Sequence, residues 1–581
     1  MENITIKING IKVSAPKGST ILEAARLAHI EIPTLCFLKD INEIGACRMC
    51  VVEVKGAKSL VVACVYPINE GMEVWTNTPK VLESRKKTLQ LLLSNHNRSC
   101  LSCVRSGNCE LQQMAKELGV EDEGYYDGEH TPSCIDDSAV HMIRDNSKCI
   151  LCRRCIAVCE KVQNIGVIGA NERGFATFVG SAFNMGLGET SCVSCGQCIA
   201  VCPTGALQEK SQVDEVLAAI ADPSKHVIVQ TAPAVRAALG EEFGYPIGTN
   251  TEGKMAAALR RIGFDKVFDT NFSADLTIME EAHEFLDRVQ NGGKLPLITS
   301  CSPGWIKYCE HYYPDMTENL SSCKSPQQMF GAIAKSYYAE KQGLDPKDIV
   351  SVSIMPCTAK KFEVQRPDEA ANGVPDVDYS LTTRELARMI RKVGIRFRDL
   401  PDEGFDAPLG LGTGAAVIFG ATGGVMEAAL RTAVETLTGE ELQSLDFTEV
   451  RGMEGIKEAT YPVAGMDVKV AVASGLGNAK KLLDKVKSGE AEYHFIEIMG
   501  CPGGCISGGQ PQQPGYVRNT VDIRALRAQV LYDSDKNNPI RKSHENPAIK
   551  ELYATYLGEP GSEKAHHLLH TTYIKRKINE I

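Results

Sequence analysis

The chain has 581 residues, several times the length of a usual domain, with 43% hydrophobic and 23% charged residues, which predicts a multidomain globular protein. Its formal net charge of -10 argues against a nucleic-acid-binding role, which would favour a basic surface. No apolar run is long enough to cross a bilayer. The first residues, MENITIKING, have no basic region followed by an apolar core, so a cytoplasmic location is expected.

Cysteine is the most informative residue type in this chain. Of the 22 cysteines, 16 precede residue 203. Long chains without an export signal use clustered cysteines for metal more often than for disulfides. The first third of the chain is therefore expected to be rich in metal sites.

The first predicted elements are a hairpin and a helix. In ITIKINGIKVSAP, isoleucines alternate before an Asn9-Gly10 turn, which is a strong hairpin signal. STILEAARLAHI then combines a cap at Ser19 or Thr20 with a helical apolar period. A hairpin and helix before a cysteine loop indicate a β-grasp, ferredoxin-like domain, which we place at residues 1–78.

Four cysteines follow with the spacing C-x10-C-x2-C-x13-C. Four thiolates can hold structural zinc or a 2Fe-2S cluster, and the preceding β-grasp pattern favours the cluster. The segment resembles the N-terminal domain of the large peripheral iron-sulfur subunit of respiratory complex I. The ligands would be Cys36, Cys47, Cys50 and Cys64.

The next motif, HNRSCLSCVRSGNC, has the spacing H-x3-C-x2-C-x5-C within a predicted domain at 79–126. A zinc knuckle is the alternative, but its position between other cluster motifs favours a His-ligated 4Fe-4S cluster. A neutral imidazole in place of an anionic thiolate should raise the reduction potential of the cluster. The ligands would be His96, Cys100, Cys103 and Cys109.

Residues 127–209 contain the same cysteine pattern twice, in SKCILCRRCIAVC and TSCVSCGQCIAVCP. Each is C-x2-C-x2-C-x3-C, the pattern of bacterial two-cluster ferredoxins, in which the fourth cysteine of each run ligates the other cluster. One 4Fe-4S cluster should therefore use Cys149, Cys152, Cys155 and Cys202, and the other Cys159, Cys192, Cys195 and Cys198. Cys134 is left over as a free thiol.

From residue 210 onward, short apolar runs alternate with helical patterns. HVIVQTAP, KLPLITSC, VSVSIMPC, VKVAVASG and YHFIEIMGC read as strands buried on both faces, which predicts a large α/β domain at 210–581 with parallel sheets in two lobes. Cofactors in such folds bind at the carboxyl ends of strands. Several of the remaining cysteines follow these strands: Cys301, Cys357, Cys501 and Cys505, with Cys309 and Cys323 elsewhere.

TSCSPGW, MPCTAKKFE and EIMGCPGGCISGGQP resemble the three signature segments of iron-iron (FeFe) hydrogenases, and with the cluster motifs essentially the whole chain is similar to their long clostridial-type form. This resemblance implies an H-cluster, in which a 4Fe-4S cubane is joined to a two-iron subsite that carries CO, cyanide and a bridging dithiolate amine. Cys357 and Cys501 would ligate the cubane, and Cys505 would bridge it to the iron pair. Lys360 would donate to a cyanide ligand. Other lining positions would be Ala232, Pro233, Gln327, Phe419 and Met499, of which Phe419 and Met499 read equally as plain core residues.

A proton route is indicated by DLTIMEEAHEFLDRV, where Glu281, Glu284 and Arg288 lie at i, i+3 and i+7 on one helical face. Taken alone, this pattern favours a solvated face with salt bridges. The family resemblance instead implies a proton path in which neighbouring groups lie within hydrogen-bond reach or one water of each other. Its members would be Cys301, Glu281, Ser321, Glu284 and Arg288.

Two features depart from the family pattern. The closing segment, GGQP from Gly508 to Pro511, is one glycine shorter than the common GGGQP form. In the usual TSCCP segment the second cysteine ligates the cubane, but here Ser302 replaces it. The fourth ligand could be Ser302, Cys301 in a changed role, or Cys323. The sequence leaves these three alternatives open.

Three classes of function are compatible with these motifs. The first is a hydrogenase, either alone with ferredoxin or as the catalytic subunit of an electron-bifurcating complex that couples H2 to NAD(P) and ferredoxin. The TSCSPGW form favours the complex. The others are an electron-transfer subunit without H2 chemistry and an iron-sulfur assembly or sensory relative. GLGLGTGAAVIFG lacks the context of a dinucleotide site, so NAD(P) and flavin would bind partner subunits. The group His566, His567 and His570 reads as part of an ordinary C-terminal helix.

Overall fold

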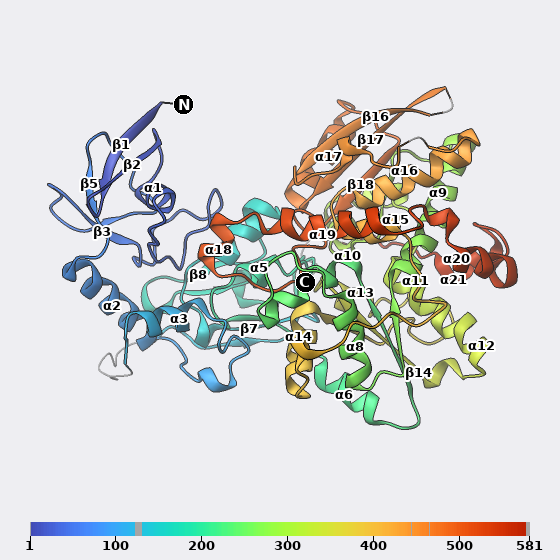
Figure 1. Ribbon diagram of the computed structural model, residues 1–581, viewed down its shortest axis with the longest axis horizontal. Coiled ribbons are helices and arrows are strands. Elements are labelled where there is room, and N and C mark those ends of the chain that lie inside the picture. Colours follow the sequence, from blue (N-terminus) through green and yellow to red (C-terminus); the bar gives the residue numbers. More distant parts are fainter. Residues whose placement is uncertain (1, 122–129, 443, 464, 577–581) are drawn as a thin grey trace. The chain divides into compact units, whose positions relative to one another are not determined.

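The computed structural model describes residues 2–121, 130–442, 444–463 and 465–576 (Figure 1). The chain divides into two compact units, which are described separately. The first consists of Met1–Thr190, Gln197–Glu209 and Gln512–Asp522, and the second of Ser191–Gly196, Lys210–Pro511 and Ile523–Ile581. The four domain limits expected from the sequence stay a prediction.

The first unit begins with the hairpin and helix expected from the sequence. Asn9 and Gly10, the turn residues, both have positive φ, as a type I′ turn requires. The helix begins after Thr20, which forms a capping box with Glu23. The mixed sheet has the order β2-β1-β5-β3-β4, with β1 and β5 parallel. Its elements are β1 (Asn3–Ile8), β2 (Ile11–Pro16), α1 (Ile21–Leu27), β3 (Val51–Val54), β4 (Val61–Val62) and β5 (Glu73–Trp75).

The rest of the first unit is built from short elements around the cysteine loops. Arg154, which is fully buried, forms an ion pair with Glu110, with 2.9 Å between Nη1 and Oε1, and so ties α4 to α3. The elements are α2 (Pro79–Ser94), α3 (Glu110–Glu117), β6 (Ile135–Asp136), β7 (Met142–Asp145), α4 (Arg154–Ala157), β8 (Gly169–Asn171), β9 (Phe178–Gly180), α5 (Gln197–Val201), β10 (Leu207–Glu209) and α18 (Gly515–Thr520).

The second unit contains two four-stranded sheets, and the first of them is entirely parallel. Its order is β12-β11-β14-β15. Almost every residue of the central strands is buried, as expected for a sheet covered on both faces. The strands are β11 (His226–Thr231), β12 (Lys266–Asp269), β14 (Ile349–Met355) and β15 (Tyr379–Thr382).

The second sheet corrects the expectation of parallel sheets in both lobes. Its order is β13-β18-β17-β16, and β16 pairs with β17 in the antiparallel sense. The two strands are consecutive, and their connection is too short for the crossover that a parallel pair needs. The strands are β13 (Leu297–Ile298), β16 (Ile456–Val463), β17 (Met466–Ser474) and β18 (Phe495–Met499), with the last three labelled beside one another in Figure 1.

A long helix, α9, packs against α11 and α16 in this unit. The helices are α6 (Val213–Ala221), α7 (Pro233–Arg236), α8 (Glu252–Ile262), α9 (Asn271–Asn291), α10 (Pro303–Tyr312), α11 (Pro326–Ile333), α12 (Ala339–Gln342), α13 (Lys360–Glu363), α14 (Thr383–Lys392), α15 (Gly414–Val417), α16 (Gly424–Thr438), α17 (Leu476–Ser488), α19 (Ile523–Asn537), α20 (Pro547–Leu552) and α21 (Glu563–Leu569). No helix among the described residues is long and apolar enough to cross a membrane.

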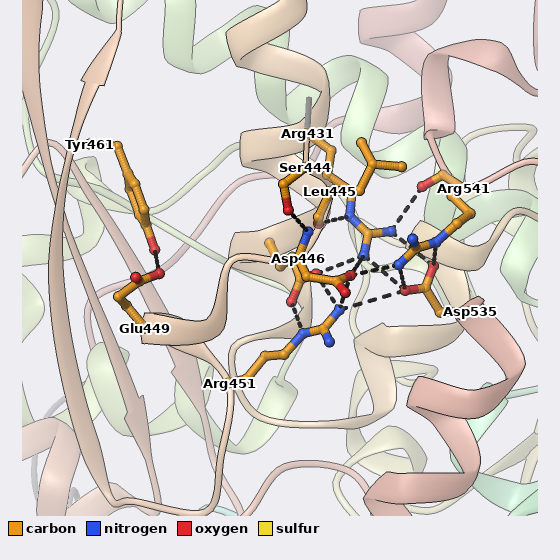
Figure 2. A network of polar contacts seen from close by, with 10 residues as sticks. Arg431, Ser444, Leu445, Asp446, Glu449, Arg451, Tyr461, Asp535 and Arg541 are labelled. Carbon is orange, nitrogen blue, oxygen red and sulfur yellow. Dashed lines mark hydrogen bonds and ion pairs between the residues drawn. The ribbon is translucent and has the colours of Figure 1, made fainter. Parts of the chain in front are cut away.

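Buried ion pairs join α16 to α19. Arg431 of α16 is fully buried and reaches Asp535 of α19 at 2.8 Å and Glu427 at 2.6 Å. Arg541 binds the same Asp535 carboxylate (Figure 2), and Arg451 binds Glu427. Because each buried charge has an opposite partner, the network fixes the two helices relative to each other.

Candidate active site

A cavity with room for water over about 80 Å³ lies in the second unit where strands of both sheets end. Its location matches the rule that ligands of α/β folds bind at the carboxyl ends of strands. The residues that surround it are Ala232, Pro233, Ala234, Thr270, Ala274, Cys301, Ser302, Pro303, Pro326, Gln327, Met355, Pro356, Cys357, Lys360, Phe419, Gly420, Met499, Gly500, Cys501, Gly504 and Cys505.

Four thiols converge on this cavity from separate loops. Cys357 follows β14, Cys501 and Cys505 follow β18, and Cys301 precedes α10. Burial, and then the neighbouring Cys357, raise the pKa of Cys505 to about 12. Thiols in such a site ionise only beside a compensating cation. Soft sulfur donors around a mostly apolar cavity therefore fit an iron-sulfur cofactor.

Two of the three alternatives for the fourth cubane ligand lie at the cavity. Cys301 and Ser302 both line the cavity, whereas Cys323 does not. The thiol of Cys323 is fully buried next to Glu284, with 3.8 Å between Sγ and Oε2. The Ser302 hydroxyl oxygen accepts the backbone N–H of Gly500 at 3.1 Å. The choice between Cys301 and Ser302 stays a prediction.

All six residues expected to line the cofactor site, including Phe419 and Met499, border the cavity. The ammonium of Lys360 donates to the Ser325 hydroxyl at 2.8 Å, to the Glu363 carboxylate at 2.8 Å and to the Cys301 carbonyl at 3.2 Å. Sequence reasoning missed Glu363 and Ser325. The i,i+3 spacing of Lys360 and Glu363 in KKFE was the signal for the first, and no signal pointed to the second.

Glu281 of α9 lies close enough to Cys301, which lines the cavity, for its charge to act on that thiol. Glu281 is only 2% exposed, which excludes the solvated-face alternative for this residue. Burial, and then the charge of Glu284, raise its pKa to about 8. Among the described residues, its Oε2 atom has no hydrogen-bond partner. Cys301 is partly exposed where it lines the cavity, and burial, followed by the charges of Cys505 and Glu281, raises the pKa of its thiol.

A row of hydrogen bonds continues from Glu281 towards the surface. The Ser321 hydroxyl interacts with Glu281 and donates to Glu284 Oε2 at 2.9 Å. Glu284 Oε1 accepts from Arg288 Nη2 at 2.6 Å, and part of the Arg288 side chain is exposed. All five residues predicted for the proton path are therefore in this region of the structure. Their role in proton transfer stays a prediction.

The first unit contains three of the four predicted accessory ligand sets in full. Cys149, Cys152, Cys155 and Cys202 line one small cavity, as the ferredoxin pattern predicts. The four cysteines of the predicted 2Fe-2S site are all buried, and hydrogen bonds link their thiols in two pairs, Cys36 with Cys47 and Cys50 with Cys64.

The remaining predicted cluster ligands are His96 with its cysteines and the second ferredoxin set. Burial lowers the pKa of His96 to about 4, and its Nδ1 atom lacks a hydrogen-bond partner among the described residues. A neutral imidazole with a free nitrogen fits a metal ligand. The remaining ferredoxin ligands are divided, with Cys159 and Cys198 in the first unit and Cys192 and Cys195 in the second. Their shared cluster stays a prediction.

Cys134 and the C-terminal histidines belong to no predicted cluster and make ordinary polar contacts. The Cys134 sulfur interacts with Asn146 Nδ2 at 3.1 Å. His566 and His567 lie in α21, as expected, and His570 caps its end. The His570 ring interacts with Ser322 Oγ at 2.8 Å and with Glu280 Oε2 at 3.1 Å.

Cysteine loops around a buried cavity, together with cysteine-rich accessory sites, define an iron-sulfur oxidoreductase. Residues 225–509 match the family described as iron only hydrogenase large subunit, C-terminal domain, and residues 521–576 match the iron hydrogenase small subunit. Residues 1–79 match a 2Fe-2S iron-sulfur cluster binding domain, 85–123 the NADH-ubiquinone oxidoreductase-G iron-sulfur binding region, and 148–206 a 4Fe-4S dicluster domain. The chain belongs to the iron-only (FeFe) hydrogenase family.

Individual relatives agree with this assignment. The chain is 53% identical to the NADP-reducing hydrogenase subunit HndD of Solidesulfovibrio fructosivorans, over 99% of this chain and all of that protein. It is 44% identical to iron hydrogenase 1 of Clostridium pasteurianum, over 98% of this chain and all of the relative. An apo FeFe-hydrogenase structure from Chlamydomonas reinhardtii superposes with a TM-score of 0.57 and 47% identity, covering 63% of this chain and all of that one. The alternative of an electron-transfer subunit without H2 chemistry is therefore not supported.

Proposed function

We propose that this hydrogenase catalyses the reversible reaction 2 H+ + 2 e- to H2 in the cysteine-lined cavity of its second unit, as the catalytic subunit of a larger complex. One observation carries the proposal: the cavity holds Cys301, Cys357, Cys501 and Cys505, and the buried carboxyl of Glu281 lies beside it. The groups that would ligate metal and the group that would carry the proton thus lie close together.

The proposed cofactors are one 2Fe-2S cluster, three accessory 4Fe-4S clusters and an H-cluster. Cys357, Cys501 and Cys505 would hold the H-cluster, with Ser302 or Cys301 completing the set. When bound, this cofactor supplies the iron centre at which protons and electrons are combined. The accessory ligand sets support the electron relay, because four of their members already surround one cavity.

The protein's own residues would position the cofactor and move protons. Lys360, enclosed by Ser325 and Glu363, would direct a cationic donor into the cavity, where low polarity strengthens hydrogen bonds to anionic ligands. The Cys301 Sγ atom would exchange a proton with the carboxyl of Glu281. With a pKa of about 8, this carboxyl is near the value that suits proton transfer at neutral pH.

From Glu281 the proton would pass through the Ser321 hydroxyl and the Glu284 carboxylate to Arg288 at the surface. The printed contacts of 2.9 Å and 2.6 Å are within the reach required for such a relay. Of these side chains, only Glu284 and Arg288 are in partial contact with solvent. The buried carboxyl is therefore shielded from bulk water, which favours directed transfer.

The partners proposed for this subunit are ferredoxin and NAD(P)-, flavin- and iron-sulfur-binding subunits. Its similarity to the NADP-reducing hydrogenase subunit HndD over the whole chain supports an assembly with a pyridine nucleotide partner and electron bifurcation. A stand-alone, ferredoxin-dependent hydrogenase is the second candidate, supported by the similarity to iron hydrogenase 1.

Two measurements test these proposals. Anaerobically matured protein should show CO and cyanide bands in its infrared spectrum and evolve hydrogen with reduced viologen, and the absence of both would refute the catalytic proposal. Native purification should recover the chain with flavin-containing subunits. A homogeneous single chain that is fully active with ferredoxin would instead establish the second candidate.

A further inference from the structure

A short loop that carries two predicted accessory ligands packs inside the catalytic unit. Residues Ser191–Gly196, which include Cys192 and Cys195, group with the second unit. The Ser191 hydroxyl interacts with the Tyr312 hydroxyl of α10 at 2.9 Å. This loop therefore lies against the same helix that begins beside Cys301 and Ser302.

The loop also makes a direct hydrogen bond to the segment that carries Cys357. The hydroxyl of Thr358 donates to the backbone carbonyl of Ser194 at 2.8 Å. Both residues are buried, with exposures of 1% and 2%. Ser194 precedes Cys195 and Thr358 follows Cys357, so the bond joins the immediate neighbours of two predicted cluster ligands.

The backbone of the loop adopts unusual conformations next to this hydrogen bond. Gly196 has φ of +66°, and a Cβ atom there would lie 2.2 Å from Thr358 Oγ1, so any other residue would displace the Thr358 hydroxyl. Ser194 also adopts a left-handed conformation, with φ of +59°, which is uncommon outside glycine and is retained only where the surrounding structure imposes it. Two unusual backbone positions thus flank one hydrogen bond.

We propose that the hydrogen bond from Thr358 to Ser194 is the electron bridge between the accessory cluster held by the Cys192–Cys195 loop and the catalytic cubane held by Cys357. The inference rests on the proposed function. The electron route between Cys195 and Cys357 consists of covalent bonds, apart from the hydrogen bond between Thr358 and Ser194. Thr358 is a positioning residue, because it contacts neither substrate nor the reacting atoms.

The step transfers one electron at a time. During hydrogen evolution, the accessory cluster held in part by Cys192 and Cys195 would give up one electron, and the cubane held in part by Cys357 would accept it. No covalent bond breaks, and the Thr358 hydroxyl keeps its proton. The external electron donor reduces the accessory cluster again.

The test compares Thr358→Val, which keeps the shape of the side chain but removes the hydroxyl, with Thr358→Ser, which keeps the hydroxyl. Thr436→Val is the matched control, because Thr436 also donates to a backbone carbonyl, that of Thr432 at 2.8 Å, within α16. Three properties are measured in the fully loaded protein. They are exchange between H2 and D2O, the freeze-quench EPR signal of the accessory clusters after mixing with H2, and the midpoint potentials of the clusters.

Exchange between H2 and D2O requires the catalytic cofactor and the proton route but no electron passage through the accessory clusters. We expect Thr358→Val to retain exchange and the midpoint potentials while the accessory EPR signal appears several-fold more slowly. Thr358→Ser and Thr436→Val should behave like the unaltered protein.

Three results would overturn the bridge: an unchanged rate of EPR signal appearance in Thr358→Val, a slower rate explained by shifted midpoint potentials, or a parallel loss of exchange, which would show that Thr358 only holds Cys357 in place. Failure of the unaltered protein to catalyse exchange would instead refute the proposed function, so the two failures are distinguishable.

Discussion

Replacement of Glu281 by glutamine should change both turnover and the pH dependence of stability. Burial, and then the charge of Glu284, raise the pKa of this carboxyl from 4.5 to about 8, so the native protein binds the proton more tightly than the unfolded chain does. This contribution to stability is fully present below about pH 4.5 and is lost as the pH rises through about 8. At about 1.4 kcal/mol per pKa unit, the loss is on the order of 5 kcal/mol.

Glutamine cannot ionise, so Glu281→Gln should not show this loss. The difference in the free energy of unfolding between the variant and the unaltered protein should be constant below about pH 4.5 and should shift in favour of the variant up to about pH 9. Turnover should fall by a factor of about 100 or more, because an amide cannot relay the proton. Thermal unfolding midpoints, measured at a series of pH values, and hydrogen evolution test the two effects.

Glu490→Gln is the matched control, because Glu490 is exposed on the surface of the same unit. It should alter neither turnover nor the pH dependence of unfolding. A pH-independent difference between Glu281→Gln and the unaltered protein would refute the raised pKa. Near-normal turnover with unchanged cluster spectra would refute the assignment of Glu281 to the proton path.

Three further variants test other parts of the structure. Cys323→Ala should leave the iron content and the cubane EPR signal unchanged, because Cys323 lies outside the cavity, and a loss of iron would contradict this. Lys360→Met should abolish the CO and cyanide infrared bands while accessory EPR signals persist, since it removes the cationic donor; retained bands would exclude that role. Asp535→Asn should lower the free energy of unfolding by about 3 kcal/mol or more by leaving Arg431 short of a buried partner, whereas exposed Asp533→Asn should have no measurable effect.

The sequence predicted the features that depend on local patterns. Apolar runs followed by cysteine located Cys357 and Cys501 at strand ends, and the ferredoxin spacing brought Cys202 together with Cys149. Alternating isoleucines and Asn9-Gly10 predicted the first hairpin. In each case the spacing along the chain fixes the geometry, because a strand or a short loop allows few alternatives.

Features that depend on packing between distant segments could not be predicted. Thr358 and Ser194 are far apart along the chain, and no local pattern indicates that they form a hydrogen bond. The exclusion of Cys323 from the cavity also follows only from its packing beside Glu284. The antiparallel pairing of β16 escaped notice because the apolar runs alone do not specify strand direction.

The buried ion network around Arg431 has a consequence for temperature. The cost of removing charged groups from water falls as temperature rises, so paired arginines and carboxylates contribute more to stability when warm than when cold. Arg431, Glu427 and Asp535 are buried together between α16 and α19. This connection should therefore weaken less on heating than the apolar contacts around it, and the contact between these two helices should be among the last to open in the second unit.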